Sequence, residues 1–202
     1  MLQGKKCFAH RIIRRFQYVT QGHHKKIRGG GKSPEKATMD YCYAHGFTSG
    51  KNFQYNSGYP IDSNFPWLIS VGDDVTLASN VRILAHDAST AKTGVRTKLG
   101  IVKIGNNVFI GADSIVLCNT RVGDNVIIGA GSVVTHDIPS NSVYAGNPAK
   151  YICSFEEYKN KHHSNQENHP IFRQHSWQEW PNVSDEEKDE MRRKLEDTFG
   201  YL

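Results

Sequence analysis

The chain has 202 residues, which is enough for one main domain with extensions at its ends. Its hydrophobic share of 38% and charged share of 22% are ordinary for a globular protein, and no run of about 18 apolar residues exists to form a transmembrane helix. The four cysteines are scattered and form no Cys-x-x-Cys pair, which argues against a disulfide scaffold or zinc knuckle. Such cysteine usage predicts a reducing, cytoplasmic location.

Residues 1–46 form a basic N-terminal extension. Ten lysines and arginines occupy its first forty positions, opposed only by Glu35 and Asp40, within a chain of formal net charge +5. Phe8, Ile12 and Phe16 share one helical face, which predicts an amphipathic helix. We expect this helix to pack on the repeat region or on a neighbouring subunit, although its charge leaves peripheral membrane contact open. We expect no nucleic acid partner.

A strict six-residue period runs from Val71 to Pro139 with one interruption. Each of its nine units begins with an aliphatic residue: Val71, Leu77, Ile83, Ile104, Ile110, Val116, Val122, Ile128 and Val134. A helix repeats near 3.6 residues and a strand near 2.0, so a period of six fits neither. It fits short strands with aliphatic side chains inside a prism and Gly, Asn or Asp at the corners, where φ is often positive. The period therefore predicts a parallel β-helix whose coils pair with their neighbours.

These units resemble the repeats of the hexapeptide-repeat acyltransferase family, and in particular its sugar and polysaccharide O-acetyltransferases. The resemblance implies a mainly β fold, a left-handed parallel β-helix with helical N- and C-terminal extensions. Residues 47–153 form this expected domain, because Gly50-Lys51-Asn52-Phe53 echoes the later units and predicts a degenerate first coil. Tyr55 and Ile61 are its expected interior residues, and the Pro- and Gly-containing segment 144–150 marks the exit from the repeat.

Residues 154–202 form a C-terminal tail that ends in a helix. Ser184 is followed three residues later by Glu187, the pattern of a capping box. The pair predicts a helix from there to about Thr198, with Gly200 as its stop.

A loop insertion near residues 89–103 interrupts the period. Ile83 and Ile104 are twenty-one residues apart, where a continuous prism would step six, so fifteen residues leave the coil. His86 stands immediately before this excursion, and long insertions at corners tend to carry function. Transfer of an acetyl group to an alcohol needs a base at neutral pH, and the imidazole of histidine suits that task.

The resemblance implies that His86 is the general base, because the segment from Gly72 to His86 matches the one that ends in the catalytic histidine of the family. It also implies that Asp74 contacts the acceptor. Asp87 is adjacent in sequence to His86, but neighbouring residues of a strand point to opposite faces. We therefore do not pair Asp87 with His86.

The resemblance further implies an acetyl-CoA site without any metal. It carries over Ala112, Ala130, Thr135 and His136 as residues along the pantetheine groove, and Lys150 as the partner of the nucleotide phosphates. Small residues let an extended pantetheine lie against the coils, and lysine serves as a point charge for phosphate. Family sites lie between subunits, which implies a homotrimer here.

The expected function is acetyl-CoA-dependent O-acetylation of a hydroxyl on a sugar or cell-surface polysaccharide. A serine acetyltransferase-like enzyme remains an alternative, although forty basic residues are too few for the helical N-terminal domain usual in that class. A non-catalytic β-helix used for assembly also remains open. A γ-class carbonic anhydrase is disfavoured, because its zinc needs three histidines and only His86 and His136 lie in the regular repeats.

Overall fold

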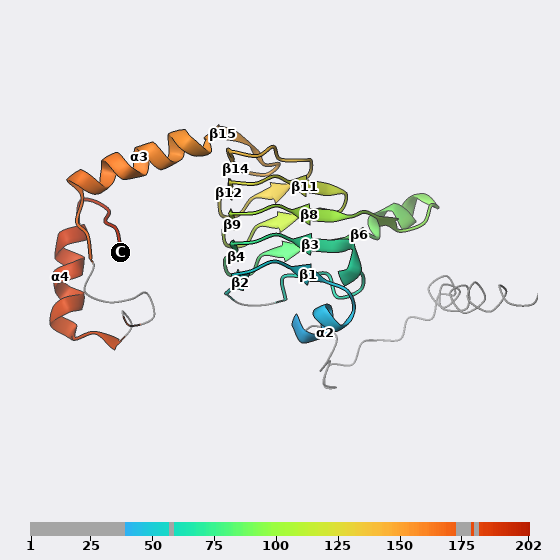
Figure 1. Ribbon diagram of the computed structural model, residues 1–202, viewed down its shortest axis with the longest axis horizontal. Helices are drawn as coiled ribbons and strands as arrows, with labels where there is room; N and C mark the ends of the chain where they lie inside the picture. Colours follow the sequence, from blue (N-terminus) through green and yellow to red (C-terminus); the bar gives the residue numbers. More distant parts are fainter. Residues whose placement is uncertain (1–38, 57–58, 173–178, 180–181) are drawn as a thin grey trace, which may run out of the picture. The chain divides into compact units, whose positions relative to one another are not determined.

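The computed structural model describes residues 39–56, 59–172, 179 and 182–202. The predicted N-terminal helix with Phe8, Ile12 and Phe16 lies outside these residues and stays a prediction. Short strands in stacked sheets, most of them parallel, build the body between Thr48 and Ser154, as the repeat predicts (Figure 1). In the described part of the chain, no helix is long and apolar enough to cross a membrane.

Three sheets form the faces of the prism, and each regular coil contributes one strand to each sheet. In pairing order the first sheet contains β1 (Thr48–Ser49), β3 (Ile69–Val71), β8 (Val102–Ile104) and β11 (Thr120–Val122). The second contains β15 (Lys150–Ser154), β14 (Ser142–Ala145), β12 (Val126–Ile128), β9 (Val108–Ile110), β4 (Val75–Leu77) and β2 (Gln54–Tyr55). The third contains β13 (Val133–Val134), β10 (Ile115–Val116) and β5 (Arg82–Ile83).

The pairing register confirms both the repeat and its interruption. Val102 pairs with Thr120, eighteen residues further on, which is three hexapeptides to a coil. Ile69 pairs with Val102, thirty-three residues further on, and the excess is the fifteen-residue excursion. The excursion therefore leaves the stacking of the coils intact.

The nine aliphatic residues that open the hexapeptides fill the prism. Each of them is at most 6% exposed: Val71, Leu77, Ile83, Ile104, Ile110, Val116, Val122, Ile128 and Val134. Burial of such side chains contributes about 1.5–3 kcal/mol apiece in area terms, so this column dominates the stability of the body. The prediction from the six-residue period is confirmed.

The corners hold Asn, Asp and Gly in the left-handed region, as the pattern predicts. One corner is a ladder of residues with φ between 52° and 60°: Asn52, Asp74, Asn107, Asn125 and Asn141. Their side chains bond from coil to coil, for instance from Asn107 Nδ2 to Asn125 Oδ1 at 2.8 Å. Short polar side chains tolerate this conformation because they can hydrogen-bond locally.

The first coil follows the later ones only in part. Ile61 is 4% exposed and forms a parallel bridge to Ile83, so its interior position is confirmed. The interior position expected for Tyr55 is wrong, because its side chain is 44% exposed. Strand β2 is the last strand of its sheet, and the Tyr55 ring stacks on Phe53 at a centroid distance of 5.9 Å instead of entering the prism.

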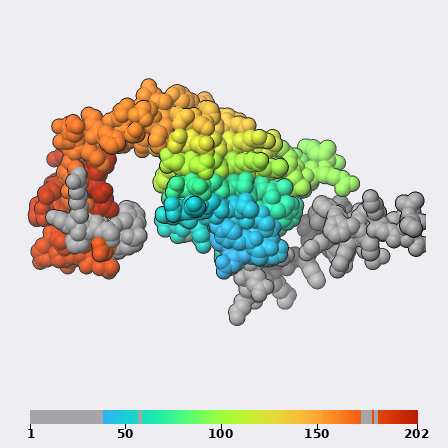
Figure 2. Space-filling view, in the orientation of Figure 1, coloured from blue at the N-terminus to red at the C-terminus, as the bar shows by residue number. Residues whose placement is uncertain are grey.

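The excursion is an antiparallel hairpin that projects from the side of the coils (Figure 2). Its strands are β6 (His86–Asp87) and β7 (Lys98–Leu99), joined through the 3₁₀ helix η2 (Ser89–Thr93). The Thr90 hydroxyl holds the hairpin together by donating to the Arg96 carbonyl at 2.8 Å and accepting from the Lys98 N–H at 3.1 Å. The hairpin thus keeps His86 at the point where the chain leaves the prism.

Helices flank the β-helix in sequence. Helix α2 (Met39–Ala44) precedes the first coil, and the 3₁₀ helix η1 (Pro66–Leu68) lies within it. After β15, helices α3 (Phe155–Asn168) and α4 (Asp185–Leu195) follow. The capping box predicted at Ser184 is confirmed, and a second one opens α3 at Ser154, where the sequence analysis did not expect a helix.

Candidate functional site

His86 lies at the junction of the prism and the hairpin. Ile83 and Ala85, just before it, are fully buried, whereas the His86 side chain is 27% exposed. The Ala85 carbonyl accepts from the Gly100 N–H at 3.0 Å, which closes the base of the hairpin beside His86. The imidazole is therefore fixed at its root and open to solvent on one side.

Asp62 is the partner of His86. Its Oδ2 lies against His86 Nδ1, although the two residues are twenty-four positions apart. The carboxylate is 3% exposed and accepts two backbone hydrogen bonds at 3.0 Å, from Ala85 to Oδ2 and from Asn64 to Oδ1. These donors compensate the burial of a charged group.

The pair has the geometry of an oriented base. A carboxylate only accepts hydrogen bonds, so His86 Nδ1 carries the proton that it donates to Asp62. The other ring nitrogen, Nε2, is then the basic one and can take a proton from a hydroxyl. The arrangement supports the predicted role of His86 and adds a residue that the sequence analysis missed.

A signal for Asp62 is present in the sequence once the first coil is aligned. Thr48 pairs with Ser70 and Ile61 bridges to Ile83, both twenty-two residues apart, so Asp62 falls beside the residues that precede His86. Asp87 was excluded as the partner, and that exclusion is confirmed. Its carboxylate accepts from the Ser89 N–H at 2.8 Å, and hydrogen bonds from Ser89 lower the pKa of Asp87 below its ordinary value.

An aromatic wall extends from His86 into a cavity. The Phe65 ring lies 5.3 Å from the His86 ring, and the Trp67 ring lies 5.7 Å from that of Phe65. Helix η1 sets Trp67 on the surface, where it is 57% exposed. The cavity measures about 450 Å³ and is lined by Phe65, Trp67, Leu68, Leu99, Gly100, Ile101, Asn119 and Arg121.

Ala112 and Ala130 occupy one corner on successive coils. The Gly131 N–H donates to the Ala112 carbonyl at 2.7 Å, and a Cβ added to Gly111 would lie 2.4 Å from the Ala130 nitrogen. A Cβ added to Gly131 would meet no atom within 4 Å, so the surface beside Ala130 is open. These small residues leave room for an extended chain such as pantetheine.

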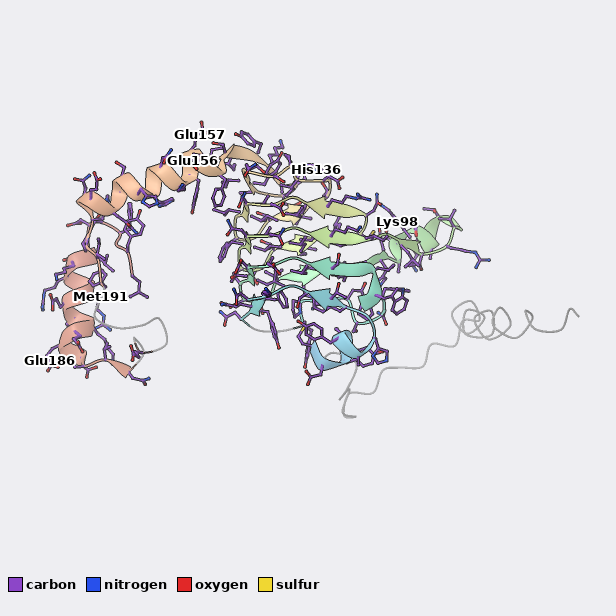
Figure 3. The ribbon with its side chains drawn as sticks, in the orientation of Figure 1. Lys98, His136, Glu156, Glu157, Glu186 and Met191 are labelled. Atoms are coloured by element: carbon purple, nitrogen blue, oxygen red, sulfur yellow. The ribbon has the colours of Figure 1, made fainter. Side chains whose placement is uncertain are left out.

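Thr135 and His136 lie at the next corner, which they share with His86. The Leu84 N–H donates to the Val116 carbonyl of the next coil at 2.9 Å, and the Leu117 N–H donates to the Val134 carbonyl of the coil after that at 3.0 Å. Leu84, Leu117 and Thr135 therefore occupy equivalent positions on three successive coils. Thr135 Oγ1 lies 3.1 Å from His136 Nδ1, and both side chains are exposed. Figure 3 shows His136 on the coils beyond the projecting hairpin that carries Lys98.

Lys150 belongs to the corner of Ala112 and Ala130. Lys150 is the first residue of β15 and pairs with Ala145. The Cβ of Ala145 lies 2.9 Å from the position that a Cβ on Gly129 would take, so Ala145 packs beside the residue that precedes Ala130. The Lys150 side chain is exposed and can meet a phosphate there. The predicted cofactor residues thus flank the third sheet on both sides.

Asp74 lies at the third corner, away from His86. Its φ of 55° and the hydrogen bond from Asn52 Nδ2 to its Oδ1, at 2.7 Å, place it in the corner ladder. A single chain does not bring Asp74 together with the His86–Asp62 pair, so its contact with an acceptor stays a prediction. Within the described residues, no group of three or more His, Cys, Asp or Glu side chains could hold a metal ion.

Comparison with known proteins agrees with the repeat. Residues 101–136 match the family described as bacterial transferase hexapeptide (six repeats). Protein CapG of Staphylococcus aureus is 49% identical over 100 residues, 48% of this chain and 58% of CapG. Galactoside O-acetyltransferase of Escherichia coli (strain K12) is 35% identical over 127 residues, 61% of each chain.

A solved structure also matches. The crystal structure of a maltose O-acetyltransferase from Clostridium difficile 630 shares 40% sequence identity, with 55% of this chain and 60% of that chain covered, at a TM-score of 0.47. This chain spans less than two thirds of the length of the relatives named here.

Proposed function

We propose that this chain is a hexapeptide-repeat transferase that transfers the acetyl group of acetyl-CoA to a hydroxyl of a sugar or cell-surface polysaccharide. The observation that carries the proposal is the His86–Asp62 pair beside an open cavity. A β-helix used only for assembly has no need of a buried carboxylate that two backbone N–H groups hold against a partly exposed imidazole.

The reaction needs one base and correct positioning. His86 Nε2 removes the proton of the acceptor hydroxyl as its oxygen attacks the thioester carbonyl carbon, and Asp62 stabilises the imidazolium that forms. The new C–O bond is kept when the C–S bond breaks, and the imidazolium returns its proton to the leaving sulfur. Acetyl-CoA, the cosubstrate, supplies the activated acetyl group.

The residues fit acetyl-CoA as a cosubstrate. The open surface beside Ala130 accommodates pantetheine, with Ala112 below it, and Lys150 on the same corner offers a cation to the nucleotide phosphates. Thr135 and His136 would contact the cofactor from the neighbouring corner. His86 lies on that second corner and not beside Lys150, which favours a site shared between chains.

We further propose a homotrimer with active sites between subunits, in which one chain provides His86 and its neighbour provides Lys150. Coexpression of differently tagged His86→Ala and Lys150→Ala chains tests this arrangement. Mixed trimers should recover part of the activity that each homotrimer lacks, because some interfaces then combine two intact halves. Mixed trimers as inactive as the parents would contradict the shared site. Cytoplasmic location and peripheral membrane contact stay predictions.

The reaction is tested with purified protein, acetyl-CoA and a panel of neutral and acidic sugars, oligosaccharides and serine, with release of free thiol as the readout. Turnover of a sugar and not of serine supports the proposal, and His86→Gln should reduce that turnover about 10²–10⁴-fold. Turnover of serine alone would favour the serine acetyltransferase alternative. No thiol release with any acceptor, together with no binding of CoA, would contradict an acetyltransferase function.

A further inference from the structure

The cavity beside His86 combines apolar walls with one cation. Its aromatic and aliphatic side chains are unusually exposed: Trp67 at 57%, Leu99 at 49% and Ile101 at 49%. Ligand sites are typically apolar clefts with a few polar groups that fix orientation. Here Arg121 is the only ionisable residue among those that line the cavity, and Asn119 is the only amide.

The cavity adjoins the base directly. Phe65 belongs to the cavity wall and also contacts the His86 ring at 5.3 Å. Leu99, which also lines the cavity, pairs with His86 across the hairpin. Two residues that line the cavity thus contact or pair with His86, so a molecule bound in the cavity would lie within one side chain of the base.

Arg121 is available to a ligand. Its side chain is exposed on β11, and its guanidinium forms no ion pair with any carboxylate in the described part of the chain. Asp137, on the following coil, accepts at 2.7 Å from the backbone N–H of Arg121. The side chain thus keeps its planar set of donors, which matches a carboxylate or phosphate in bidentate geometry.

We propose that this cavity binds the acceptor and that the acceptor is an acidic sugar, whose anionic group meets Arg121 while its ring lies against Trp67. Aromatic rings present large flat apolar surfaces with little loss of conformational freedom, which suits the apolar face of a pyranose. This inference rests on the proposed acetyl transfer and adds the chemical class of the acceptor.

Lys103 provides a matched control for Arg121. The two residues pair in register on neighbouring strands of the same sheet, and both side chains are exposed. Lys103 lines a different groove and not the cavity beside His86. A general effect of positive charge would therefore respond to both residues, and a specific contact only to Arg121.

Binding is measured directly by ligand-observed NMR with the full chain and three probes: methyl glucuronide, glucose 6-phosphate and methyl glucoside. We expect one or both acidic probes to bind more tightly than the neutral one. Arg121→Gln should weaken acidic binding about ten- to hundredfold, as for loss of hydrogen bonds to a charged group, and leave neutral binding unchanged. Lys103→Gln should change neither, and Arg121→Lys should restore part of the affinity.

The two acidic probes distinguish a carboxylate from a phosphate as the recognised group. Equal binding of all three probes, no binding of any, or equal losses in Arg121→Gln and Lys103→Gln would each overturn the inference. Thiol release with acetyl-CoA separates it from the proposed function. Turnover of neutral sugars without preference for acids contradicts only the acidic acceptor, whereas Arg121-dependent binding without any turnover contradicts only acetyl transfer.

Discussion

The carboxylate of Asp62 lies against Nδ1 of His86 and joins the irregular first coil to the point where the chain leaves the prism. Asp62 is almost fully buried and also accepts hydrogen bonds from the backbone N–H groups of Asn64 and Ala85. The carboxylate is therefore held rigidly and acts as an orienting group for the imidazole. A base on a projecting hairpin would otherwise be free to rotate about its side-chain bonds.

Substitution of either member of the pair should reduce kcat. His86→Gln removes the base and should cost about 10²–10⁴-fold. Asp62→Asn should cost at least about tenfold, because a neutral amide stabilises the imidazolium less than a carboxylate does, and one of its two orientations also loses the bond to His86. Asp87→Asn is the control, since an amide oxygen still accepts from Ser89. Wild-type kcat in Asp62→Asn, measured by thiol release, would exclude the orienting role.

The regular coils could be predicted because each of them repeats the same physical demand. An aliphatic residue must enter the prism every sixth position, as Val122 and Ile128 do, and the corner between them needs a residue that tolerates positive φ, here Asn125. Equivalent positions of successive units therefore carry similar residue types at a constant spacing of six residues. The excursion was visible for the same reason, as a break in an otherwise constant step.

Asp62 and Tyr55 could not be placed in the same way, because the first coil obeys a different spacing. Twenty-two residues separate Thr48 from its partner Ser70, so the phase of six is lost between them. At the end of the stack an aromatic side chain such as Tyr55 can also lie outside without opening a cavity. Contacts between distant segments, such as Phe65 with His86, depend on that folded path and not on any local pattern.

Thr120→Val should stabilise the protein. Thr120 is fully buried in β11 and its Oγ1 has no hydrogen-bond partner. The free energy of the folded state is therefore raised by the cost of desolvating an unpaired hydroxyl. Valine has the same shape, and we expect a gain of about 1 kcal/mol in the free energy of unfolding, measured in urea. Ser114→Ala is the contrasting variant, because the buried Ser114 hydroxyl donates to Gly129 at 3.0 Å, and it should destabilise. Effects of the same sign in both variants would contradict this account.

Asn125→Ala should destabilise more than Asn125→Gly. Asn125 has φ of 53°, and its side chain accepts from Asn107 at 2.8 Å and donates to Asn141 at 2.9 Å. Both variants lose these bonds, but only alanine must also place a Cβ in the left-handed region, at an added cost of about 1–2 kcal/mol. Chemical denaturation of the two variants measures the difference. Equal stabilities would show that backbone conformation contributes nothing at this corner.

The first turn of α3 should lose protection in acid. The N–H and hydroxyl of Ser154 donate to the Glu157 carboxylate, and these bonds, the backbone one first, lower the pKa of Glu157 below its ordinary value of 4.5. A carboxyl group whose pKa is lower in the folded state stabilises fully above its unfolded value, and that contribution disappears as pH falls through the folded value. Amide exchange, corrected for intrinsic rates, should therefore show α3 opening more readily from about pH 6 to about pH 3. Glu157→Gln has no group to titrate, so its protection should stay flat over the same range, and an equal decline in both proteins would assign the acid effect to another group.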